Sequence, residues 1–85
     1  MELNNKIITF RQNLLILERE LDSMESKGEG VPAEIRKCRG FVQVLRFKVQ
    51  EIMRSGDSLE VKTRTYQGCV NNLTYISGLI SEMKF

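Results

Sequence analysis

The fold of this chain is decided by residues 35–52, which read IRKCRGFVQVLRFKVQEI. The apolar residues in this stretch recur at alternating intervals of three and four: Ile35, Cys38, Val42, Leu45, Val49 and Ile52. At about 100° per residue, this spacing places all six on one face of an α-helix, as at the a and d positions of a coiled-coil heptad. The pattern therefore predicts a helix over residues 32–54 whose apolar stripe is buried against other helices.

The segment before this stretch carries the same pattern. Its apolar stripe predicts a helix over residues 2–27 and consists of Leu3, Ile7, Phe10, Leu14, Leu17, Leu21 and Met24. Gly28 follows the last of these and can adopt the left-handed conformation that ends many helices. Pro32 suits the first turn of the next helix, where its missing N–H is not needed. The two helices are therefore expected to be joined by a short turn.

The segment after this stretch is less regular. Its apolar residues are interrupted by Lys62 and comprise Leu59, Tyr66, Cys69, Leu73, Ile76, Ile80 and Met83. Residues 59–66 also partly alternate and include Val, Thr and Tyr, which favour strands. We predict a helix over residues 58–83 because the stripe continues for almost four heptads, which is too long for a typical strand. Asp57 and Glu60 have the spacing of a capping box at its start.

These three segments predict an all-α fold in a single domain over residues 1–85. The chain folds either as an up-down-up three-helix bundle or as an antiparallel helical coiled-coil hairpin with a third helix. The longest purely apolar run spans only residues 14–17, whereas a membrane-spanning helix needs about 20 residues. The chain also begins without a continuous apolar stretch of the signal-peptide kind, so a cytoplasmic location is expected. Cys38 and Cys69 both lie on buried stripes and are expected to be free thiols, as in a reducing compartment.

The composition argues against an enzyme. The chain contains no histidine, which removes Ser-His and Cys-His nucleophile arrangements, histidine bases and most zinc sites. Two isolated cysteines cannot form a structural zinc site with four ligands. We therefore expect no enzymatic activity, no cofactor and no metal site.

Apolar residues outside the three stripes point to a binding surface. They lie on the outer faces of all three helices, together with one glycine: Ile8, Leu15, Gly40, Val44, Phe47, Val61, Tyr75 and Leu79. We expect this set to bind a protein partner or a second copy of the chain, with Phe47 as the anchor, since large aromatic side chains dominate interface energetics. The function would be that of an adaptor or of a secretion-type or assembly chaperone that acts through helix faces. The competing interpretation is a slightly rotated bundle with scattered exposed apolar residues.

The charge distribution supports a second hypothesis. Residues 31–56 hold six basic and two acidic residues, and a nucleic-acid-binding regulator could use Arg36, Lys37, Arg39, Arg46 and Lys48. However, the first helix carries Glu18, Glu20, Asp22 and Glu25 in its second half. An antiparallel hairpin would place these carboxylates beside Arg36, Lys37 and Arg39, where the charges would set the helix pairing. We favour this internal pairing and keep nucleic-acid binding as the alternative.

Overall fold

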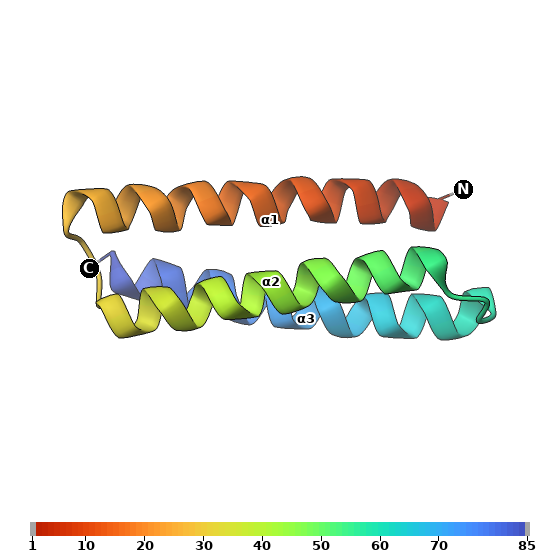
Figure 1. The fold of residues 1–85 in the computed structure, drawn as a ribbon. Helices are drawn as coiled ribbons and strands as arrows, with labels where there is room; N and C mark the ends of the chain where they lie inside the picture. The colour runs from red at the N-terminus through yellow and green to blue at the C-terminus, as the bar shows by residue number, and fades with distance from the viewer. Residues whose placement is uncertain (1, 85) are drawn as a thin grey trace.

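Three helices account for nearly all of residues 2–84, the part of the chain that the computed structural model describes, and this part contains no strand. α1 spans Glu2–Lys27, α2 spans Pro32–Arg54 and α3 spans Leu59–Met83. The helices run up, down and up beside one another, and each contacts the other two (Figure 1). The predicted three-helix bundle is therefore confirmed, and residues 59–66 are helical. Within the described residues, no helix has the length and apolarity that crossing a bilayer would require.

The core lies along the axis shared by the three helices. Every residue of the predicted stripes in α1 and α2 is buried, and among residues 2–84 no polar or charged residue is buried with them. α3 contributes less, because only Cys69, Ile76 and Ile80 are fully buried on it. Tyr66, Leu73 and Met83 are half-buried and pack against the core. The third stripe is therefore confirmed over most of its length.

Leu59 is the exception in the third stripe, because it is exposed. The Tyr66 hydroxyl donates a hydrogen bond of 3.3 Å to the Lys6 carbonyl, which sets the level at which α3 lies beside α1. Leu59 lies two helical turns before Tyr66 and so lies level with a point before the start of α1. No residue of α1 is available to cover it.

The turn between α1 and α2 depends on glycine. Gly28 has a φ of 70°, which is the left-handed conformation expected from the sequence. Its N–H donates to the Glu25 carbonyl at 3.2 Å, and the Glu29 N–H donates to the Met24 carbonyl at 2.8 Å. These two bonds form a Schellman motif, which satisfies carbonyls that the helix end leaves without partners. α2 then begins at Pro32, as predicted.

The start of α3 differs from the prediction. The N-cap is Ser58, whose side-chain oxygen accepts a hydrogen bond of 3.3 Å from the Val61 N–H. Asp57 instead donates its backbone N–H to the Ser55 hydroxyl at 2.9 Å. The predicted capping box of Asp57 and Glu60 is therefore wrong, since the helix begins one residue later than that motif requires.

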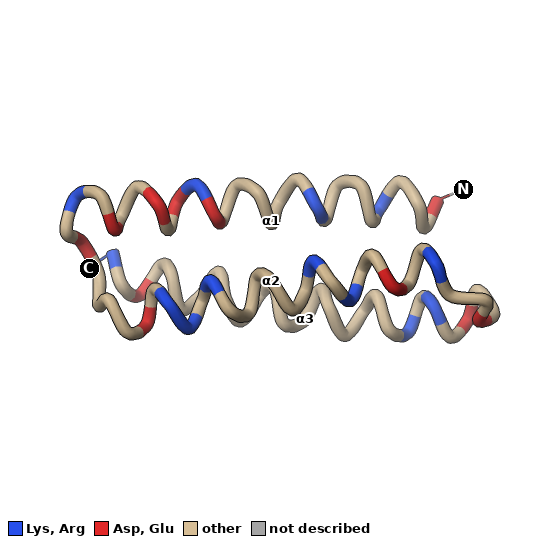
Figure 2. Tube along the Cα trace, in the orientation of Figure 1, with Lys and Arg blue, Asp and Glu red and all other residues tan. Residues whose placement is uncertain are grey.

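Ion pairs join the helices along the flanks of the core. Except for Glu2 at its start, the acidic residues of α1 lie in the half nearest the α1–α2 turn, beside basic residues of α2 (Figure 2). Arg39 lies 2.6 Å from Asp22 and 3.2 Å from Glu25, and Arg46 pairs with Glu18. The predicted internal pairing is therefore confirmed for Arg39 and extends to Arg46.

The prediction is wrong for the other members of that set. Arg36 and Lys37 form no ion pair among residues 2–84, and Glu20 pairs with Lys84, just after the end of α3, instead of with α2. Glu20 lies two residues beyond Glu18 and therefore points about 200° away from it around the helix. The two flanks of α1 thus face different neighbours.

Candidate protein-binding surface

The outer face of α2 exposes three large apolar side chains within two helical turns. Phe41 is 37% exposed, Val44 is 51% exposed and Phe47 is 62% exposed. Gly40 lies beside them, and a Cβ placed on it would meet nothing within 4 Å. The exposure of Val44 and Phe47 agrees with the sequence pattern. Phe41 is the least exposed of the three, because it lies at the edge of the core stripe, where its neighbours cover part of the ring.

A groove of about 620 Å³ runs between α2 and α3 next to this face. Phe47 lines it from α2, and Gly68 lines it from α3. A Cβ placed on Gly68 would also meet nothing within 4 Å, so no side chain fills the groove at this position. The groove is therefore open to a side chain or a helix approaching from outside.

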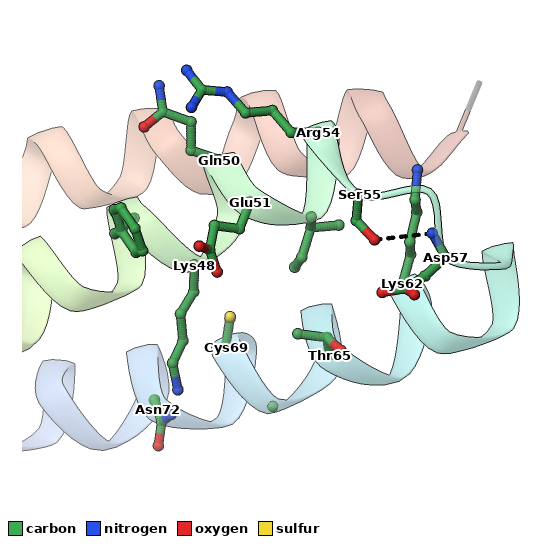
Figure 3. Close-up of a pocket in the computed structure, with 13 residues that line it drawn as sticks. Lys48, Gln50, Glu51, Arg54, Ser55, Asp57, Lys62, Thr65, Cys69 and Asn72 are labelled. Atoms are coloured by element: carbon green, nitrogen blue, oxygen red, sulfur yellow. Dashed lines mark hydrogen bonds between the residues drawn. The ribbon is translucent and has the colours of Figure 1, made fainter.

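Five charged residues line the groove, with both signs represented. Lys48 extends from α2 toward α3 and ends near Asn72 (Figure 3). The remaining four are Glu51, Arg54, Asp57 and Lys62. Among residues 2–84, none of these five charges lies in an ion pair. Their charges are therefore available to groups on another molecule.

The two cysteines offer no reactive group to this surface. Cys38 and Cys69 are both buried and free, as predicted. Burial raises the pKa of each thiol above its ordinary value, and the nearby Lys48 offsets only part of that rise for Cys69. Since the thiolate is the nucleophilic form, both side chains are poor nucleophiles at neutral pH. Within residues 2–84, no group of three or more acidic or thiol side chains is arranged to hold a metal ion.

The structure divides the other predicted surface residues among three places. Val61 and Tyr75 are exposed on α3, in the same heptad row as Gly68, and so lie on the side that faces the groove. Leu79 is half-buried and packs against the core, so it belongs to the bundle interior rather than to an exposed face. Ile8 and Leu15 line a separate shallow groove between α1 and α2, next to Arg46.

These two grooves do not form one surface. Arg46 and Val44 are two residues apart on α2 and point about 160° away from each other at 100° per residue. The predicted outer stripes on all three helices are therefore not continuous. The groove lined by Phe47 is the larger of the two, at about 620 Å³ compared with about 340 Å³ for the groove lined by Ile8 and Leu15.

The basic residues of the nucleic-acid hypothesis are also divided. Arg39 and Arg46 are held by carboxylates of α1, and the hydrogen bond that Arg39 donates to Asp22 raises the pKa of Arg39 further. Arg36 and Lys37 are exposed on α2, while Lys48 lines the groove. The five side chains therefore do not form a single basic surface.

One pattern on α2 was missed by the sequence reasoning. Five exposed residues, which we call the outer row, repeat at intervals of four and three on the side of α2 toward α3: Lys37, Phe41, Val44, Lys48 and Glu51. This is a second heptad seam, and its signal is present in the sequence. It was overlooked because charged residues occupy its two ends while its centre is apolar.

Comparison with models of protein families, with curated proteins and with solved structures found no match to this chain.

Proposed function

We infer that this chain is a small, non-enzymatic protein-binding module of the adaptor or assembly-chaperone kind. The observation that carries this proposal is the exposure of Phe47 beside Val44, on the face of α2 that borders the groove. Covering apolar surface stabilises a complex by about 25 cal/mol per Å², and aromatic side chains seated in pockets contribute most of the binding energy at many interfaces. Phe47 is the anchor of the proposed surface.

The arrangement of these residues supports a binding site over scattered exposure. Single exposed apolar residues are common on proteins and carry no meaning. A contiguous apolar patch with a polar rim is typical of an interaction surface. Here Phe41, Val44 and Phe47 form the patch, and Lys48 and Glu51 belong to the rim. Gly40 leaves room for the backbone of a partner helix to approach closely.

Nucleic-acid binding is the less favoured alternative. Two of its five basic residues, Arg39 and Arg46, are already neutralised within the bundle. The remaining three are Arg36, Lys37 and Lys48. Binding to DNA or RNA that weakens steeply with added salt and requires these three residues would favour this alternative. The free thiols of Cys38 and Cys69 are consistent with a cytoplasmic site of action for either function.

The proposal is tested with Phe47→Asp and the matched control Ile16→Asp. Ile16 is 58% exposed on α1, compared with 62% for Phe47 on α2, so the two changes cost the folded chain similarly little. We expect Phe47→Asp to weaken association at least about tenfold, because it places a charge at the centre of the interface. Sedimentation of the purified chain measures its self-association. Capture of the tagged chain after co-expression with candidate partner proteins measures its binding to other proteins.

Ile16→Asp should associate as the unmodified chain does. Circular dichroism shows whether both variants keep their helices. If Phe47→Asp associates as well as Ile16→Asp does, the outer face of α2 is not the binding surface.

A further inference from the structure

Three residues of the outer row, Lys37, Val44 and Glu51, are complementary to themselves when α2 is turned end for end, and Phe47 beside the row then lies level with Phe41. Lys37 and Glu51 each lie seven residues from Val44, on opposite sides. Phe41 and Phe47 each lie three residues from Val44. A second α2 running in the opposite direction, level at Val44, therefore places Lys37 opposite Glu51 and Phe41 opposite Phe47.

We propose that the partner of this face is a second copy of the chain, with the two α2 helices packed antiparallel about a two-fold axis at Val44. This proposal rests on the function proposed above, because it assigns the partner of the same surface. The contact is isologous, so each pair of opposing residues occurs twice. The two Val44 side chains meet at its centre, Phe41 and Phe47 flank them on either side, and opposite charges lie level with each other at both ends.

The charges select this arrangement from its competitors. A parallel pair would place Lys37 opposite Lys37 and Glu51 opposite Glu51, which is repulsive. Shifting the antiparallel pair by one heptad places Val44 opposite Lys37 in one direction or opposite Glu51 in the other. Both shifts press a charged group against apolar surface, and such a group is costly to desolvate without a partner. The antiparallel pair centred on Val44 avoids all of these contacts.

The residues next to the outer row fit the same arrangement. Glu34 and Arg54 each lie ten residues from Val44 and would lie level with each other, on opposite flanks of the contact. Neither of them, nor Lys37 or Glu51, lies in an ion pair among residues 2–84. Gly40 and Lys48 each lie four residues from Val44. The open space above Gly40 accommodates the longer side chain of Lys48 from the second copy.

The size of the molecule is sufficient for such a contact. The bundle measures 44 × 16 × 16 Å between Cα atoms, so one long face has an area of roughly 700 Å² before side chains are added. A stable interface buries about 800 Å² on each partner. A dimer through the outer face of α2 would therefore need an area comparable to one whole long face of the bundle.

The experiment reverses the end charges one at a time and then mixes the variants. In Lys37→Glu, the new carboxylate faces the carboxylate of Glu51 at both ends of the dimer. In Glu51→Lys, the new ammonium group faces the ammonium group of Lys37 at both ends. Each single variant should therefore dimerise about tenfold more weakly than the unmodified chain, as sedimentation velocity at about 50 mM salt would show, where screening is weak.

Mixing the two single variants restores opposite charges at both ends of the dimer. The mixture should therefore dimerise as tightly as the unmodified chain. The double variant Lys37→Glu/Glu51→Lys should also recover, because its two reversed charges again face each other with opposite signs.

Several results would overturn the second copy as partner. The unmodified chain could stay monomeric at about 200 μM. The single variants could dimerise as tightly as the unmodified chain. The mixture could dimerise no more tightly than either single variant alone. A single variant that misfolds would lose helicity. Mixing two misfolded variants could not restore dimerisation, so recovery on mixing shows that both variants are folded. A monomeric chain that still binds a different protein through Phe47 would end this proposal and leave the proposed function standing. If Phe47→Asp leaves all association unchanged, both proposals fail.

Discussion

Ile7 and Ile8 are neighbours on α1 that occupy opposite environments. Ile7 is fully buried, whereas Ile8 is 49% exposed. Truncating Ile7 removes apolar contacts and leaves a cavity, so Ile7→Ala should lower the free energy of unfolding by about 2–5 kcal/mol. Ile8→Ala should change it by no more than about 0.5 kcal/mol, because the side chain makes few contacts and Ala favours the helix. Urea unfolding followed by circular dichroism measures both.

The contrast between these two variants tests the orientation of α1. A similar loss for both would mean that α1 is rotated relative to the core described above. A small loss for Ile7→Ala would mean that the core is loose and relaxes around the cavity.

The two buried thiols predict a dependence of stability on pH. Burial raises the pKa of Cys38 and Cys69 in the folded chain above the ordinary value of 9.0. Once the pH passes that value, the unfolded chain releases thiol protons that the folded chain retains, so stability falls as the pH rises. The loss has a limiting slope of about 1.4 kcal/mol per pH unit for each thiol. The difference in urea midpoint between the unmodified chain and Cys38→Ala/Cys69→Ala should therefore change between about pH 8 and pH 10.

The alanine variant is the reference because it lacks both thiols and keeps every other ionisable side chain. Its midpoint should fall less steeply with pH than that of the unmodified chain. Parallel curves for the two proteins would show that the thiols are not shielded from water in the folded state.

At the scale of single residues, burial in α1 and α2 could be predicted from spacing alone. All thirteen stripe residues of these helices are buried, because an unbroken alternation of three and four leaves only one face to cover. Leu59 and Phe41 could not be predicted in this way. The exposure of Leu59 depends on where the neighbouring helix α1 begins, and that of Phe41 depends on how much of the ring its neighbours cover. Neither can be inferred from local periodicity.

The start of α3 offers a test at the scale of one element. The Ser58 hydroxyl accepts a hydrogen bond from the Val61 N–H, one of the N–H groups that the helix itself cannot satisfy. Ser58→Ala should therefore lower the free energy of unfolding by about 1 kcal/mol, as urea unfolding would show. Asp57→Ala should lower it by only a few tenths of a kcal/mol, because Asp57 lies outside the helix and contributes only through its charge near the helix start.

A larger loss for Asp57→Ala than for Ser58→Ala would reverse this assignment and restore the capping box expected from the sequence. The sequence alone could not decide between them, since Asp and Ser are both good N-cap residues. The position of the cap follows from the rotation of α3 that buries Cys69, Ile76 and Ile80, which is set by packing against two other helices.

At the scale of the whole molecule, the bundle could be predicted but the grouping of its surface residues could not. The sequence indicated exposed apolar residues on every helix. Which of them lie together depends on which flank of α2 faces α1, and Val44 and Leu15 end on different sides for that reason. Ion pairs between the helices lie on the flank of α2 that faces α1. One of them joins Glu18 and Arg46, which are 28 positions apart in the sequence.

The pair of Glu18 and Arg46 predicts a measurable coupling between α1 and α2. Both side chains are partly buried, so water screens them less than it screens the exposed pair of Glu60 and Arg64 within α3. A double-mutant cycle with Glu18→Gln and Arg46→Gln should give a coupling of about 1 kcal/mol, and the same cycle on Glu60 and Arg64 should give about 0.3–0.5 kcal/mol. Equal couplings in the two cycles would mean that the pair between helices is as solvated as the one within α3. The flank of α2 facing α1 would then be chosen by apolar packing alone, and removing both charges would leave the α1–α2 pairing unchanged.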